Sequence, residues 1–134
     1  MKHRFASAAI AAAILVTLAS SAVSQADKEW VDIKGEKELR ALYSNKTLRG
    51  KTPSGVAFVG HYRADGTGVL IMNDQRIPRT WAVKGKDQVC ITQASGTDCY
   101  TFERHRTNPN QIIGRNVAQL WHVEMTVEDG IPKF

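Results

Sequence analysis

The sequence lacks the short motifs by which most catalytic centres are recognised. It has no Gly-X-Ser-X-Gly elbow, no His-Glu-X-X-His pair and no glycine-rich phosphate loop. Beyond the N-terminal segment it has three histidines, His61, His105 and His122, whose spacing is not that of metal ligands. His61 and His122 fall on the polar side of alternating segments, so we expect both side chains in solvent. We expect no catalytic residue, no metal site and no cofactor.

Long apolar runs are missing except at the start of the chain. Residues 2–4 are Lys-His-Arg, residues 5–23 are uncharged and rich in Ala, and residues 24–26 are Ser-Gln-Ala. This order is typical of a secretory signal peptide, and its short Ala-rich form is typical of bacteria. We predict cleavage after Ala26, which leaves residues 27–134 as one domain with no stable membrane insertion. The expected location is the periplasm, and release outside the cell is left open.

Clusters of like charge are also missing. Two of the 18 basic residues, Lys2 and Arg4, fall in the predicted signal peptide, so the formal charge of +5 drops to about +3 in the mature chain. The other basic residues are scattered along the sequence. A nucleic-acid-binding domain usually presents a basic stripe or a recognised module. Neither is present, and we expect no nucleic acid among the partners.

Cysteine is scarce, since only Cys90 and Cys99 occur. An exported chain meets an oxidising compartment, which favours a disulfide between them. Eight residues separate the two, so the tight Cys-X-X-Cys spacing of redox sites is absent and a structural role is indicated. If Cys90 lies opposite Cys99 in a hairpin, Val89 and Tyr100 face the core while both cysteines face outward.

One short segment has the period of a helix and the rest alternates like strands. Leu39, Leu42 and Tyr43 fall at i, i+3 and i+4 within residues 36–43, after an acidic first turn. Residues 27–33 form an extended lead-in. Pro78 should lie at the start of its strand or at an edge. The mature chain is therefore predicted to be mainly β, a meander curled into a small barrel with one short N-terminal helix. The predicted strands are residues 55–63, 68–73, 76–84, 88–93, 97–104, 111–114 and 121–128.

Five segments, taken in order, carry a resemblance. They are Glu38–Tyr43, Lys46–Lys51, Tyr62–Thr67, Trp81–Gly85 and Val89–Ile91 with the later Cys99. Together they resemble a family of small exported proteins of unknown function from rhizobia, agrobacteria and their relatives. The resemblance spans about residues 39–102. It implies a periplasmic protein with a lipocalin-like barrel, and it implies no catalytic residue.

The strand at residues 76–84 contains the one unusual side chain. Arg79 shares the phase of Trp81, so an inward-facing phase carries a guanidinium into an apolar interior, which is costly unless the charge is paired. A ligand carboxylate or phosphate could pair it. The alternative is that Arg79 lies at the barrel mouth with its head in water. The predicted ligand-binding residues are Tyr62, Arg79, Trp81 and Tyr100.

Two functions follow from these observations. The first is a non-enzymatic periplasmic binding or envelope-accessory protein, whose barrel holds a small apolar or anionic ligand. The alternative is a protein interaction module, such as a periplasmic inhibitor of a lysozyme-type enzyme, with the loop at residues 107–110 as the inserting element. A ligand binder should contain a cavity larger than a few waters, whereas an inhibitor should be solid inside.

Overall fold

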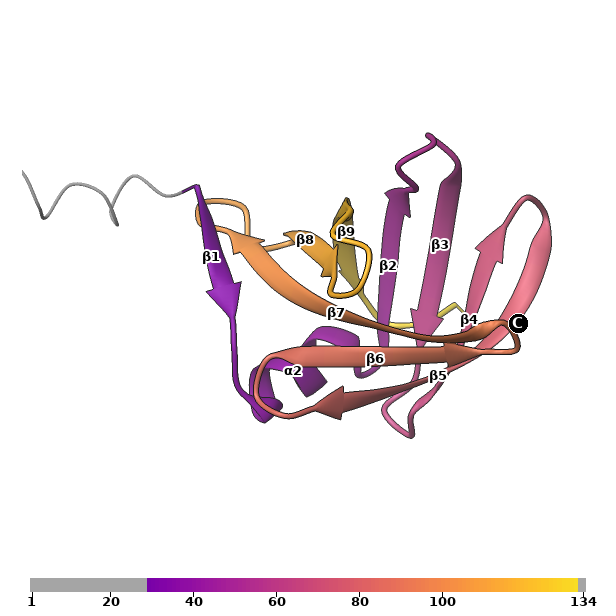
Figure 1. Cartoon of the computed structure of the whole chain (residues 1–134), viewed down its shortest axis with the longest axis horizontal. Coiled ribbons are helices and arrows are strands. Elements are labelled where there is room, and N and C mark those ends of the chain that lie inside the picture. The colour runs from indigo at the N-terminus through magenta and orange to yellow at the C-terminus, as the bar shows by residue number, and fades with distance from the viewer. Residues whose placement is uncertain (1–28, 133–134) are drawn as a thin grey trace, which may run out of the picture.

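The chain forms an antiparallel barrel in which consecutive strands lie side by side (Figure 1). The computed structural model describes residues 29–132, and the predicted signal peptide lies outside them. Besides the helix α2 (Glu36–Tyr43), the described part contains nine strands. They are β1 (Trp30–Ile33), β2 (Lys46–Lys51), β3 (Ala57–Tyr62), β4 (Thr67–Met72), β5 (Gln75–Lys84), β6 (Gln88–Gln93), β7 (Gly96–His105), β8 (Gln111–Asn116) and β9 (His122–Asp129).

The sheet closes because its last strands return to the first. Strands β2 to β7 pair in sequence, β2 also pairs with β9, and β8 joins β9 to β7. In this ring of eight strands each strand has a paired neighbour on both sides, whereas β1 pairs only with the end of β7. In Figure 1, β5, β6 and β7 run across the direction of β2, β3 and β4, as the twist of a barrel requires. The predicted barrel with one short helix is confirmed.

The helix α2 packs into the barrel as its sequence predicted. Leu39, Leu42 and Tyr43 are buried and belong to the core. The start of the helix is held by the turn between β5 and β6, because the Gly35 N–H donates to the Lys86 carbonyl at 2.7 Å. Within residues 29–132, no helix has the length and apolar character needed to cross a membrane.

The strand β2 closes the barrel, yet the sequence pattern does not predict it. Leu48 is its only large apolar residue. Gly50 faces the side chains of two neighbouring strands, and a Cβ placed on it would lie 2.9 Å from the Phe58 ring and 3.0 Å from Met125 Cγ. Side chains of the neighbouring strands thus fill the space that an inward side chain at Gly50 would occupy. The alternation of apolar and polar residues that identifies a strand is therefore lost in β2. The expected count of seven strands in the barrel is therefore one too low.

The strand β5 runs through Pro78. It spans Gln75–Lys84, so the expectation that the strand begins at Pro78 is wrong. However, β6 pairs with β5 only from Thr80 onward, and at Pro78 the only neighbour is β4. Pro78 therefore lies at a local edge, where its missing N–H costs no hydrogen bond to β6. Of the two alternatives left open for this strand, the structure shows the one in which the phase of Arg79 and Trp81 faces the interior.

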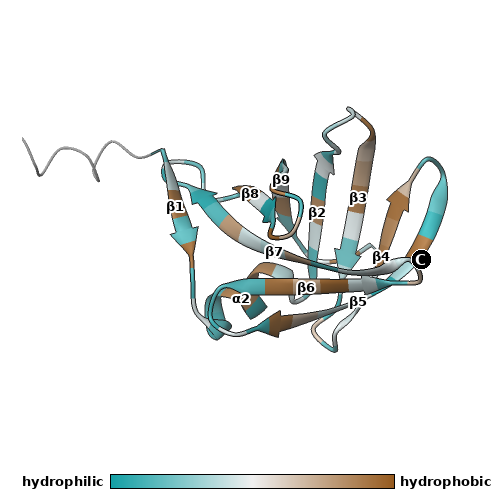
Figure 2. Ribbon diagram, in the orientation of Figure 1, coloured by the Kyte–Doolittle hydropathy of each residue, from teal (hydrophilic) through white to brown (hydrophobic). Residues whose placement is uncertain are grey.

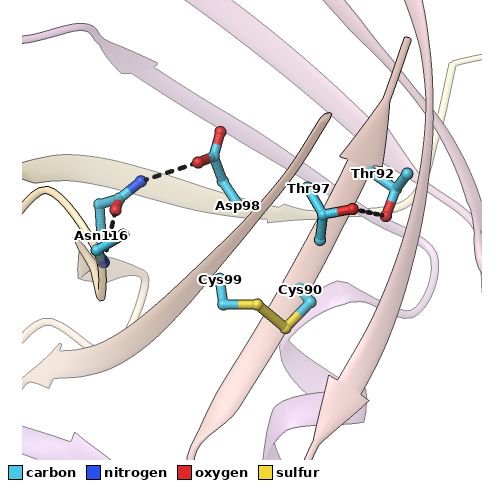
Figure 3. The surroundings of a disulfide bond; sticks show 7 residues. Cys90, Thr92, Thr97, Asp98, Cys99 and Asn116 are labelled. Atoms are coloured by element: carbon cyan, nitrogen blue, oxygen red, sulfur yellow. Dashed lines mark hydrogen bonds between the residues drawn. A yellow bond between two sulfur atoms is a disulfide. The ribbon is translucent and has the colours of Figure 1, made fainter. Parts of the chain in front are cut away.

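A disulfide joins β6 to β7 on the outer face of their hairpin (Figure 3). Cys90 and Cys99 are direct partners in the ladder, and Val89 beside Cys90 is fully buried. Next to the disulfide, the Thr92 and Thr97 hydroxyls are hydrogen-bonded at 2.8 Å. The predicted pairing and the outward position of both cysteines are confirmed.

The strand β4 is apolar on both of its faces, and Figure 2 shows it almost entirely in the hydrophobic colour. Leu70 and Met72 point into the barrel, where they line a cavity. Val69 and Ile71 alternate with them on the outer face and are half-buried. Substitutions at an inner position of this strand can therefore be compared with the same substitutions at an adjacent outer position.

Candidate functional site

The barrel encloses a cavity of about 140 Å³. Tyr43 of α2 and Leu48 of β2 line it at one end, while Thr52 and Pro53 of the β2–β3 turn line its rim. An engineered cavity of about 150 Å³ admits benzene, so this cavity has room for about one ring. Most of the remaining lining is apolar and comes from strands all around the barrel: Phe58, Leu70, Met72, Ile91, Phe102, Gly114, Trp121, Val123 and Met125.

Arg79 is the charged residue in this lining. Its Nε donates to Gln93 Oε1 at 2.8 Å, and its Nη1 donates to the Tyr62 hydroxyl at 3.2 Å. Both acceptors are neutral, and no carboxylate within residues 29–132 forms an ion pair with Arg79. The side chain is half-buried. The guanidinium thus lies against the cavity without an acidic partner.

Tyr62 reaches Arg79 because two inward-facing glycines leave room for its ring. The side chain of Tyr62 is only 3% exposed. A Cβ on Gly60 would lie 2.6 Å from the ring, and a Cβ on Gly68 would lie 2.7 Å from it. Burial raises the pKa of Tyr62, and the charge and hydrogen bond of Arg79 partly offset this. The phenol is therefore neutral at physiological pH and keeps a proton that it can donate.

Tyr43 is a site residue that the sequence predicted only as part of the helix core. Its ring centroid lies 4.7 Å from that of Tyr62. Burial raises the pKa of Tyr43 well above its ordinary value, Tyr62 and Tyr100 raise it further, and Arg79 lowers it. These groups are therefore close enough to interact electrostatically. A buried tyrosine needs a place for its hydroxyl, but the helical spacing in the sequence indicates only that Tyr43 is buried.

Three of the four predicted ligand-binding residues share the cavity. Tyr62, Arg79 and Tyr100 all line it, whereas Trp81 is not part of the described lining. The Trp81 ring is 5% exposed, packs 5.5 Å from the Tyr43 ring and donates its Nε1–H to the Arg63 carbonyl at 2.8 Å. Trp81 therefore belongs to the core packed against Tyr43 and not to the cavity lining.

His61 is buried, although we expected it in solvent. It lies on the outer face of β3 but is only 5% exposed. The Thr47 hydroxyl donates to the Gly130 carbonyl at 2.8 Å, so the His61 Nδ1–H donates to that hydroxyl at 2.8 Å. Burial lowers the pKa of His61, and the charges of Arg49 and Arg76 lower it further. The alternation pattern misplaced His61 because the chain after β9 crosses back over β2 at Gly130.

The loop at residues 107–110, considered above as an inserting element, is exposed and tied to β7. His105 Nδ1 accepts the backbone N–H of Thr107 at 3.3 Å and that of Asn108 at 3.0 Å. Because Nδ1 is an acceptor, the Nε2–H is the donor to Glu29 Oε1 at 2.9 Å. This loop belongs to the β7 end of the molecule and not to the cavity lining.

Comparisons with known proteins give no identification. The chain matches no protein-family model, no curated protein and no solved structure. A functional conclusion therefore rests on the cavity and on the side chains that surround it.

Proposed function

We propose that this chain is a non-enzymatic binding protein of the bacterial envelope, which holds a small apolar or anionic molecule inside its barrel. The observation that carries the proposal is the cavity of about 140 Å³, which is lined by apolar side chains, one guanidinium and three phenols. Ligand pockets typically combine apolar walls with a few convergent polar groups. The interior of an eight-stranded barrel is either filled by side chains or holds one small ligand, and a cavity favours the second case.

The envelope location is supported by two features of the sequence. Residues 1–26 have the pattern of a signal peptide, and the disulfide between Cys90 and Cys99 is of the kind that persists in an oxidising compartment. The resemblance to small exported proteins of rhizobia and their relatives favours the same location and a lipocalin-like use of the barrel. An inhibitor of a lysozyme-type enzyme is the less favoured function, because inhibition by the loop at residues 107–110 requires no cavity.

Native mass spectrometry of the mature protein, purified gently from its own periplasm, tests the proposal. A carried ligand should add mass to the native ion, and denaturation without reduction should release that mass. Leu70→Trp fills the cavity from β4 and should abolish the added mass. Val69→Trp makes the same change at the adjacent outward position and should leave the added mass in place.

The two variants are compared only after circular dichroism shows that both are folded. If Leu70→Trp does not fold, Val123→Phe fills the cavity from β9 instead. Identical native and denatured masses of the wild-type protein contradict the proposal. They would favour a protein partner.

A further inference from the structure

The cavity contains a positive charge that the protein does not neutralise. Arg79 carries the charge, and no Asp or Glu is found among the described lining residues. A cation in a mainly apolar cavity is costly in free energy, and a bound anion offsets that cost. One guanidinium calls for one negative charge, so a monoanion fits better than a dianion.

Arg79 also keeps donors that the protein does not use. Of its five N–H groups, the Nε–H is taken by Gln93 and one Nη1–H is taken by Tyr62. The second Nη1–H and both Nη2–H groups have no acceptor within residues 29–132. These donors form the end of the guanidinium fork, whose spacing matches the two oxygens of a carboxylate.

Two phenols add further donors beside this fork. The Tyr62 oxygen accepts from Arg79, so its own O–H proton needs another acceptor, and residues 29–132 supply none. The Tyr43 hydroxyl likewise makes no hydrogen bond within the described residues. Both side chains are more than nine-tenths buried, and both line the cavity. An oxygen of a ligand bound in the cavity can therefore accept a hydrogen bond from either hydroxyl.

The remaining lining of the cavity limits the rest of the ligand. It is formed by side chains with no charge, among them Phe58, Met72, Val123 and Met125. A volume of about 140 Å³ accommodates a body of about one aromatic ring, and a long acyl chain is too large. Inorganic phosphate would fill the polar side only and would leave the apolar wall without contacts.

We infer that the ligand is a small carboxylic acid with a compact apolar or aromatic body, bound as its anion. Its carboxylate accepts from Nη1 and Nη2 of Arg79 and from the Tyr62 hydroxyl, and its body packs against the apolar wall. This inference rests on the proposed binding function and specifies the class of ligand.

Isothermal titration calorimetry of the delipidated mature protein tests the inference with three probes. Sodium benzoate has the inferred charge and size, benzamide has the same size without the charge, and inorganic phosphate has charge without the body. Benzoate should bind about tenfold to a hundredfold more tightly than benzamide, which is the range expected for charge-assisted hydrogen bonds. Phosphate should give no measurable heat.

Variants show which side chains cause the difference in affinity between benzoate and benzamide. Arg79→Gln should bring benzoate down to the affinity of benzamide, whereas Arg63→Gln removes an exposed charge outside the cavity and should change neither affinity. Tyr62→Phe keeps the ring over its glycines but removes the hydroxyl, and it should weaken benzoate about threefold to tenfold. Melting curves establish that each variant is folded.

The possible outcomes separate this inference from the function on which it rests. Equal affinities for benzoate and benzamide in the wild-type protein overturn the carboxylate assignment, and the barrel is then a site for neutral molecules. Equal losses in Arg79→Gln and Arg63→Gln also overturn it, since the effect is then one of overall charge. Binding of none of the probes overturns the inference, and identical native and denatured masses in addition overturn the binding function.

Discussion

At the scale of single residues, the lining of the cavity depends on glycines, whose lack of a side chain leaves room for a neighbouring ring. Gly60 and Gly68 face into the barrel, and Tyr62 occupies the space above them. The hydroxyl of Tyr62 is thereby held against Arg79. Two glycines that a sequence pattern treats as gaps in a strand thus place a phenol in the lining of the cavity.

We predict that Gly68→Ala destabilises the protein by about 1–3 kcal/mol, the range for overpacking a core. The new Cβ would lie 2.7 Å from the Tyr62 ring and 2.8 Å from the His61 carbonyl oxygen, which is backbone and cannot move away easily. Urea unfolding measures the change. Gly114→Ala is the matched control, because its Cβ would meet only side-chain atoms, the end of Met125 at 3.0 Å and the Phe102 ring at 3.1 Å, and should cost less. The idea fails if Gly114→Ala is the more harmful of the two.

His61 should make the protein less stable in mild acid. Because burial lowers its pKa in the folded chain, the unfolded chain binds the proton first as the pH falls through the ordinary value of 6.5. The free energy of unfolding therefore decreases below pH 6.5, until the pH falls below the lowered pKa. We predict that urea unfolding at pH 7.5 and pH 5.0 shows a smaller loss of stability for His61→Gln than for wild type.

The exposed His122 provides the control for this pH dependence. His122→Gln should lose as much stability between the two pH values as the wild-type protein. Equal slopes for His61→Gln and wild type would show that the buried imidazole does not couple folding to protonation.

Much of the candidate site could be predicted from the sequence, for a specific reason. Arg79 was recognisable because a charged residue interrupted an apolar phase, and Tyr62 and Tyr100 shared the inward phase of their strands. Tyr43 could not be recognised as a site residue, since helical spacing shows that it is buried but not what its hydroxyl faces. Trp81 faces inward as its strand phase indicates, but it packs against Tyr43 and does not line the cavity. Strand phase alone does not show which inward side chains reach the cavity.

At the scale of elements, the hairpin of β6 and β7 is fastened by its disulfide. The two cysteines are nine positions apart, so the bond closes a short loop. By chain-entropy reasoning a loop of this length contributes less than about 3 kcal/mol. The fold of the hairpin itself rests on Val89, Ile91 and Phe102, which are buried in the core.

We therefore predict that the double variant Cys90→Ser, Cys99→Ser keeps the far-ultraviolet circular dichroism spectrum and melts at a lower temperature than wild type. A reductant should lower the melting temperature of wild type and leave that of the variant unchanged. An identical melting temperature of wild type and variant in non-reducing buffer would show that the disulfide contributes nothing to stability.

The elements could be predicted wherever their inward side chains are large. In α2, Leu39 and Leu42 mark the buried face, and in β9 apolar and polar residues alternate. In β2 the signal fails, because its partners Phe58 and Met125 supply the bulk that Gly50 lacks. A barrel closes through pairing between strands that are distant in sequence. The strand β2 takes part in this closure although its own sequence lacks the alternating apolar pattern of a strand.

At the scale of the whole molecule, the barrel has two different ends. On one side α2 inserts Leu39, Leu42 and Tyr43 into the core. On the other, the cavity reaches the β2–β3 turn at Thr52 and Pro53. A closed ring of strands with one end filled by a helix gives a rigid wall, and a rigid wall lowers the entropy cost of holding a small ligand.

The most direct test of barrel binding is a methyl NMR titration of the mature protein with sodium benzoate. We predict shifts for the methyl groups of Leu70, Met72 and Met125, which line the cavity, and little change for Val69 and Ile71 on the outer face of β4. Shifts confined to the outer methyl groups, or no shifts at saturating benzoate, would contradict the conclusion that the interior of this barrel binds a small carboxylate.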